Sequence, residues 1–323
     1  MPPRDRSVPA PAAVLSVLAG LAALSIVLFM TVGARGDWGF LLSFRGSKVA
    51  TMVLVGTAIA VSTVLFQTVA GNRILTPAIM GFDALYGLIQ TGLVYLMGSA
   101  FVAALDPRLR FGAEVAVMVL FSVSLYRWLF SGGVKSLHLL MLVGIVLGVL
   151  FRSLSTFLQR VIDPNEFLVV QDRLFASFNR PDPDLLLAST VAVLAVSIIG
   201  WRMARTYDVL ILGRDAAVNL GVEHRRVVTG VLLIVAVLVS VSTALVGPVT
   251  FLGLLVANLA YMLIPSHQHR LILPAAALIS IVTLVSGQLV LERVFAFDSA
   301  LSIVIEFVGG LFFIFLLVRG LAR

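Results

Sequence analysis

The chain of 323 residues contains no cysteine and few charged residues. Without cysteine it can form neither disulfide bonds nor thiolate metal sites. Asp, Glu, Lys and Arg make up only 12% of the chain, whereas they make up about 25% of a typical soluble domain. Hydrophobic residues account for 60%. A soluble globule could not cover that much apolar surface, so we expect an all-α integral membrane protein.

Motifs of catalytic and nucleotide-binding sites are also missing. The chain has no HExxH, GxSxG or GxxxxGK[ST] pattern. His267 and His269 lie close together, but two histidines alone are a poor ligand set, and we expect solvated side chains at the end of a span. We therefore predict that the chain is not an enzyme and has neither a cofactor nor a metal site.

The net charge of +7 does not indicate a nucleic-acid partner. In a soluble protein such an excess of basic residues would raise that hypothesis. Here the basic residues are scattered between apolar stretches, so membrane topology and lipid headgroups explain them better.

Long apolar stretches recur along the chain, and a helix needs roughly 20 such residues to cross a bilayer. The third and eighth stretches are the weakest, so nine spans are an alternative to ten. The first is too long for the core of a signal peptide, and we expect it to stay uncleaved. Basic residues cluster after the sixth, which favours cytoplasmic N- and C-termini. We predict about ten transmembrane helices, at residues 12–33, 47–69, 79–98, 112–130, 136–156, 184–203, 227–247, 250–264, 272–292 and 301–319.

Two polar connections are long enough to have structure of their own. Residues 157–183 fall outside the cell in this topology, and residues 204–226 fall inside. The inner connection reads ARTYDVLILGRDAAVNLGVEHRR, a helix-compatible apolar stripe with turn glycines at Gly213 and Gly221. The residues alone leave two interpretations open: a surface helix on the lipid headgroups, or a docking element for a cytoplasmic partner.

Two acidic residues stand out within the predicted spans, and such residues mark transport pathways in membrane proteins. Glu306 in the tenth span is a candidate for gating, with a structural carboxylate that faces the bundle interior as the alternative. Asp83 lies near a predicted cytoplasmic end, where water can solvate it.

Small residues and a repeated pentapeptide bear on how the spans pack. Gly144 and Gly148 form a GxxxG motif, which permits close helix contact. The segments VSTVL at 61–65 and VSTAL at 241–245 resemble each other, as the repeats of many transporters do. Five residues are short enough for chance to be an alternative explanation.

Four stretches, in one order along the chain, resemble a known family. They are similar to the FecCD-type permease subunits of bacterial ABC importers for ferric siderophores, a group that includes the vitamin B12 permease. The resemblance implies a single transmembrane permease domain over residues 1–323, with the helix bundle of type II ABC importers, in the bacterial cytoplasmic membrane. The four stretches are Arg45-Gly46-Ser47-Lys48 with the helix and the Asn72–Pro77 turn that follow, LILGRDAAVNLGV, GPVTFLGLLVANLAYMLIPSHQHRLILPAAAL and LERVFAFDSALSIVIEFVGGLFFIFLL.

The resemblance also implies partners and site residues. In this family two permeases form a channel, an ABC ATPase dimer drives it, and a periplasmic or lipoprotein substrate-binding protein delivers the ferric siderophore. Arg45, Lys48 and Arg293 match positions that meet glutamates of the binding protein, with anchoring of span ends as the alternative. Residues 204–226 would be the coupling segment that docks on the ATPase, through Leu212, Gly213, Arg214, Ala216, Ala217, Leu220 and Gly221.

The chain departs from the family pattern in places, which weakens any transfer of fine mechanism. Ala257-Asn258-Leu259-Ala260-Tyr261 replaces a Pro-His-Ile-x-Arg stretch, and Ala300 replaces a proline. The runs DRLFASFN and LGRDAAVNLGV look most like permeases for catecholate siderophores such as petrobactin or vibriobactin. In such systems the second permease is often a different chain, so a heterodimer is expected and a homodimer is the alternative. Two other functions stay open: an ion-coupled carrier that uses Glu306 or Asp83, and a permease of the same fold for haem or cobalamin.

Overall fold

A computed structural model describes residues 10–33, 37–131, 137–179, 182–294 and 301–318. Within these ranges the secondary structure is helical and contains no β-strand. The predicted all-α fold is therefore confirmed. The residues before position 10, Ala300 and the last five residues lie outside the described ranges.

Ten of the described helices are apolar, which agrees with the predicted count of about ten. Seven are long and apolar enough to cross a membrane: α1 (Pro11–Thr31), α2 (Trp38–Ala70), α5 (Pro107–Ser131), α6 (Leu137–Val161), α8 (Pro183–Arg202), α11 (His224–Val246) and α13 (His269–Arg293). Three shorter apolar helices complete the set: α3 (Phe82–Met97), α12 (Leu252–Leu263) and α14 (Leu301–Val318).

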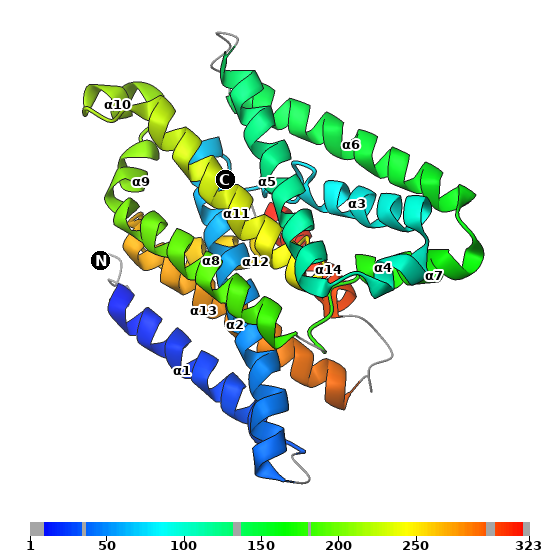
Figure 1. The fold of residues 1–323 in the computed structure, drawn as a ribbon. Coiled ribbons are helices and arrows are strands. Elements are labelled where there is room, and N and C mark those ends of the chain that lie inside the picture. Colours follow the sequence, from blue (N-terminus) through cyan, green and yellow to red (C-terminus); the bar gives the residue numbers. More distant parts are fainter. Residues whose placement is uncertain (1–9, 34–36, 132–136, 180–181, 295–300, 319–323) are drawn as a thin grey trace.

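Four short helices mark the two ends of the bundle. α4 (Ser99–Ala104) and α7 (Pro164–Leu174) lie at the end that also holds the connection between α1 and α2, here called the outer end. α9 (Ala204–Leu210) and α10 (Arg214–Asn219) lie at the opposite end, here called the inner end (Figure 1). The two polar connections of the sequence therefore lie at opposite ends, as predicted.

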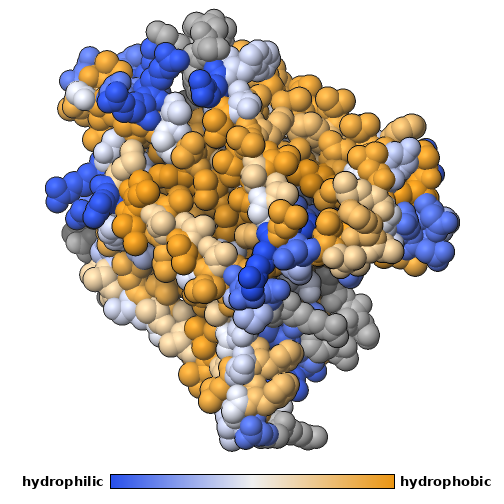
Figure 2. Space-filling model, viewed as in Figure 1, coloured by the Kyte–Doolittle hydropathy of each residue, from blue (hydrophilic) through white to orange (hydrophobic). Residues whose placement is uncertain are grey.

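The centre of the bundle is built on α2, which packs against α11, α12 and α13. Most of α2 and α11 is buried, whereas α1, α5, α6 and α8 expose much of their apolar surface. Figure 2 shows this apolar surface over the middle of one face, with hydrophilic side chains gathered over α9 and α10. At 1.5 Å per residue the 33 residues of α2 extend about 50 Å, which exceeds the roughly 30 Å hydrocarbon core of a bilayer. One rigid helix thus joins the two ends.

The GxxxG motif of α6 packs against a turn rather than against another helix. A Cβ atom added at Gly148 would lie 3.0 Å from the Cα atom of Gly81, and one at Gly144 would lie 2.9 Å from Met80. Gly81 has φ +94°, a conformation that side chains disfavour. The turn before α3 therefore approaches α6 closely because all three glycines lack side chains.

Three helices at the outer end begin in the same way, with an aspartate followed by proline. The Oδ1 atoms of Asp106, Asp163 and Asp182 accept hydrogen bonds from the backbone N–H two residues later, at 2.8, 2.9 and 2.9 Å. Each carboxylate satisfies an otherwise unpaired donor of the first turn, and proline at the first helical position needs no such partner. These caps define the starts of α5, α7 and α8.

Candidate functional site

The predicted coupling segment folds as two short helices with a sharp turn between them. α9 ends at Leu210 and α10 begins at Arg214, with Gly213 at φ +92° between them. Gly221, at φ +82°, follows α10. The apolar stripe is therefore divided between two helices, with Ile211 directly after α9 and Gly213, at its positive φ, directly before α10.

The predicted coupling residues divide into an exposed set and a buried one. Leu212 and Leu220 are each 62% exposed, and Arg214 is exposed beside them. Ala217 is 0% exposed and packs into the core cluster. Ala217 therefore holds α10 in place and offers no surface to a partner, whereas the two leucines and Arg214 do.

α9 is attached to the core by a buried histidine. His269, at the start of α13, is only 1% exposed, so the expectation that it is solvated is wrong. Its Nδ1 atom lies 2.7 Å from Oδ1 of Asp208 in α9, and its Nε2 atom lies 2.7 Å from Oγ1 of Thr68 in α2. Tyr207 packs edge-on against the imidazole, with ring centroids 5.5 Å apart. Burial raises the pKa of the Tyr207 hydroxyl to about 12, so that hydroxyl stays protonated.

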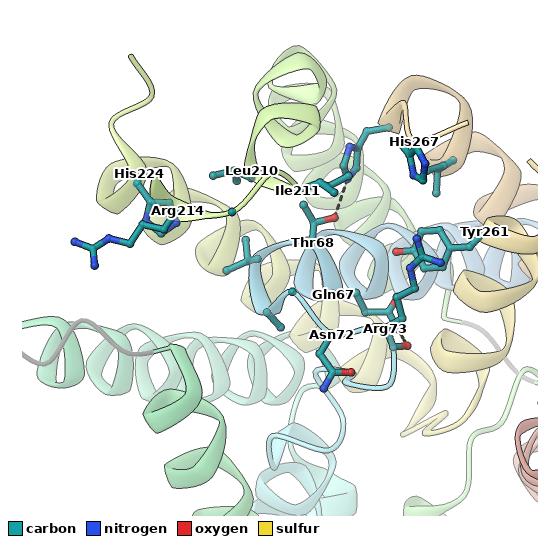
Figure 3. A pocket seen from close by; sticks show the side chains of 16 residues that line it. Gln67, Thr68, Asn72, Arg73, Leu210, Ile211, Arg214, His224, Tyr261 and His267 are labelled. Carbon is teal, nitrogen blue, oxygen red and sulfur yellow. Dashed lines mark hydrogen bonds between the residues drawn. The ribbon is translucent and has the colours of Figure 1, made fainter. Parts of the chain in front are cut away.

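A cavity of about 760 Å³ lies beside this contact at the inner end (Figure 3). Basic side chains line it, among them Arg73, Arg214 and the exposed His267. The guanidinium of Arg73 stacks over the Tyr261 ring at 4.7 Å from the ring centroid. Within the described residues no group of three or more histidines and carboxylates is arranged to hold a metal ion.

At the outer end, the predicted docking residues make contacts within the chain. Arg45 is buried, and its guanidinium donates to the carbonyl oxygens of Phe29 at 2.8 Å and Val32 at 3.0 Å, which caps the end of α1. The guanidinium of Arg293 also donates to the Val32 oxygen, at 2.8 Å, but Arg293 remains exposed. The three basic residues are thus brought to one end, and their role in docking remains a prediction.

Lys48 forms a buried ion pair that the sequence did not indicate. Its Nζ atom lies 2.9 Å from Oε1 of Glu292 in α13, with side-chain exposures of 5% and 11%. The Nε2 atom of Gln288 donates to the same carboxylate at 3.1 Å and to Oδ1 of Asn179 at 3.0 Å. This network connects α2, α13 and the segment before α8.

The two acidic residues singled out in the spans lie in different surroundings. Glu306 is exposed on α14, so the alternative that it faces the interior of this bundle is wrong. Asp83 is half-buried in the first turn of α3 and accepts a hydrogen bond from Oγ1 of Thr250 at 2.8 Å, so it is not a solvated end residue.

Both copies of the repeated pentapeptide line one small polar cavity next to Asp83. Ser62 and Thr63 reach it from α2, and Ser242 and Thr243 reach it from α11. Its volume of about 20 Å³ has room for one water molecule. The pentapeptides therefore meet in space, although their similarity in sequence alone did not require it.

Comparisons with known proteins relate the whole chain to membrane transport proteins. The FecCD transport family matches residues 10–319. The petrobactin import system permease protein YclO of Bacillus subtilis is 48% identical over 305 residues, which cover 94% of this chain and 96% of that protein. The petrobactin import system permease protein FatC of Bacillus anthracis is 36% identical over 271 residues, which cover 84% of this chain and 77% of that protein.

A solved structure shares the fold. It is an inward-facing metal-chelate type ABC transporter, with a TM-score of 0.83 and 22% identity, covering 96% of this chain and 100% of that one. At that level of identity the similarity concerns the fold alone.

Proposed function

Because the chain belongs to the FecCD transport family, we propose that it is the permease subunit of an ATP-driven ABC importer that moves a ferric siderophore across the bacterial cytoplasmic membrane. The observation that carries this proposal is the 48% identity to a petrobactin import permease over nearly the full length of both proteins. Ferric petrobactin, a catecholate chelate, is the proposed substrate. The chain itself is a multi-pass membrane protein and not an enzyme, so a separate subunit must hydrolyse the ATP.

We propose that the coupling segment docks on an ABC ATPase at the inner end. Leu212 and Leu220 present exposed apolar surface, with Arg214 beside them. A surface of this kind fits a partner with an apolar cleft and an acidic rim. The positive φ of Gly213 and Gly221 allows the turns that project α10 from the bundle.

A second permease subunit is proposed to cover the exposed face of α14. Glu306 lies on that face beside the exposed side chains of Ile303 and Phe307. A carboxylate in contact with lipid is costly, so such residues face a partner or an aqueous pathway. We infer that Glu306 faces the channel between two permeases, where it can take part in gating. The family resemblance favours a different chain as the second subunit.

A substrate-binding protein is proposed to dock at the outer end. Of the three basic residues there, Arg293 is exposed and can meet a carboxylate of the partner directly. Arg45 and Lys48 are buried, so we propose that both shape the docking surface from beneath it. Arg45 can also supply positive potential, whereas Glu292 compensates the charge of Lys48.

Reconstituted uptake tests the proposed function. Proteoliposomes that contain this chain, its ATPase and a second permease are expected to accumulate ferric petrobactin only with ATP and the binding protein present. Uptake driven by an ion gradient without nucleotide would instead identify a secondary carrier. Preferential uptake of haem or cobalamin in the same vesicles would support the assignment as an ABC permease and would change the proposed substrate.

A further inference from the structure

Three helices meet at a single imidazole at the inner end. His269 in α13 lies between Asp208 of α9 and Thr68 of α2, and both of its ring nitrogens are within 2.7 Å of a partner oxygen. Asp208 also accepts the backbone N–H of His269, at 2.8 Å. The carboxylate therefore fixes both the ring and the first residue of α13.

The chemistry of the three groups determines which atom donates and which accepts in each hydrogen bond of this contact. An ionised carboxylate can only accept hydrogen bonds, so Nδ1 of His269 carries the proton that points to Asp208. In the neutral ring, Nε2 is then left to accept from the Thr68 hydroxyl, whose single hydrogen is shared between that nitrogen and the backbone oxygen of Val64, at 2.8 Å. Because the ring is enclosed, an unmade bond cannot be replaced by water at no cost. A displacement of α9 therefore pulls on α13 and α2 together.

α9 lies between the contact at His269 and the exposed helix α10. α9 has seven residues, and it continues through Leu212 and Gly213 directly into α10. Much of the coupling segment beyond α9 is exposed, whereas α2 and α13 are central helices that reach the outer end. α9 is thus one route by which a movement of α10 would enter the core, besides the buried Ala217 and the continuation of the chain into α11.

We propose that His269 is a positioning residue that transmits displacement of the coupling segment to α2 and α13. The inference rests on the proposed function, in which an ATPase moves residues 204–226. Breaking the contact would let the ATPase move α9 and α10 while the central helices stay in place. ATP would then be hydrolysed with little transport.

The test measures ferric petrobactin uptake and ATP hydrolysis in the same proteoliposomes of the complete complex. His269→Leu removes both ring bonds, Thr68→Val removes one at nearly constant volume, and Asp208→Asn keeps an acceptor oxygen. We expect the first two to lower uptake per ATP at least tenfold and about threefold, with hydrolysis within twofold of wild type. Asp208→Asn should retain at least half of the wild-type ratio. Thr229→Val, at an exposed threonine of α11 whose hydroxyl donates to the backbone oxygen of Arg225, is the matched control for Thr68→Val and should change nothing.

The ratio of uptake to hydrolysis separates transmission from stability. A purely structural role would lower both rates together and leave their ratio unchanged, and that result would overturn the inference. If His269→Leu does not fold, Thr68→Val still tests the inference. If the wild-type complex itself shows no ATP-driven uptake, the proposed function fails and this inference fails with it. Normal wild-type uptake with unchanged ratios in folded variants removes this inference alone.

Discussion

The outer and inner ends of the molecule both join α2 to α13, but they do so with different chemistry. At the outer end a buried ion pair between Lys48 and Glu292 makes the connection, at 2.9 Å. At the inner end Thr68 and His269 make it through a hydrogen bond of 2.7 Å, and Asp208 adds a third helix. The outer network also includes Asn179 before α8, whereas the inner contact includes α9, which leads into the exposed helix α10.

This difference indicates where the bundle can move. Separating a buried ion pair leaves an uncompensated charge and is very unfavourable, whereas a neutral hydrogen bond is worth only about 0.5–1.5 kcal/mol net. We expect the outer connection to act as a fixed point and the helices at the inner end to move during transport, with the contact at His269 kept formed. Four substitutions test this contrast, in order of decreasing expected effect.

Lys48→Met should be the most damaging change. It leaves the buried Glu292 without its cation, which costs about 3–5 kcal/mol. Thermal unfolding of the purified protein in detergent should show a clear decrease in the midpoint. Replacing both Lys48 and Glu292 by Met should restore most of the stability, because no unpaired charge remains. A single variant as stable as wild type would show that the outer connection is not the fixed point.

Arg214→Glu should abolish most transport without affecting folding. Arg214 is exposed, so its replacement should change the free energy of unfolding by less than about 0.5 kcal/mol. A reversed charge facing an acidic rim costs several kcal/mol, so uptake should fall more than about tenfold. Arg214→Lys keeps the charge and is the control. Full uptake by Arg214→Glu would remove the assignment of the coupling segment.

Gly213→Ala should loosen the inner end locally. A side chain at φ +92° is strained by about 1–3 kcal/mol, although a Cβ atom there would meet no described atom within 4 Å. Hydrogen exchange should therefore become faster in residues 204–222, and the unfolding midpoint should decrease by only a few degrees. Gly230→Ala, in the middle of α11, is the matched control and should not raise exchange. Unchanged exchange in Gly213→Ala would show that the turn does not depend on glycine.

Arg293→Glu should have the smallest effect, on the kinetics of association. An exposed charge at the edge of an interface mainly changes the on-rate, so binding of the substrate-binding protein should slow several-fold at low salt. The difference should shrink at high salt, because salt screens exposed charges. Arg293→Lys is the control. An unchanged on-rate at low salt would refute a docking role for Arg293.

Much of the fold could be predicted because its strongest signals are local. Each membrane-spanning helix is a run of apolar residues, and the turn at Gly213 is marked by the glycine itself. The alternative that Glu306 faces the interior of this bundle is wrong, because a run that is apolar all round does not show which face of α14 packs inward.

The contacts of His269 and Lys48 could not be predicted from the sequence. His269 and Asp208 are 61 residues apart, and Lys48 and Glu292 are 244 apart. Such pairs depend on how the helices pack, and the spacing of residues in the sequence does not indicate that packing. The sequence indicated only that His269 lies near the end of a span. That position suggested a solvated side chain, whereas the structure has a buried one.

The Asp-Pro starts of α5, α7 and α8 also have a consequence for biogenesis. A membrane protein is inserted segment by segment, and each helix must begin before its final neighbours arrive. Starting a helix is the unfavourable step, and an aspartate cap with a following proline lowers its cost using neighbouring residues alone. Three segments on the outer side thus carry the residues that favour the start of their own helices, so that these starts do not depend on contacts with helices that are made later.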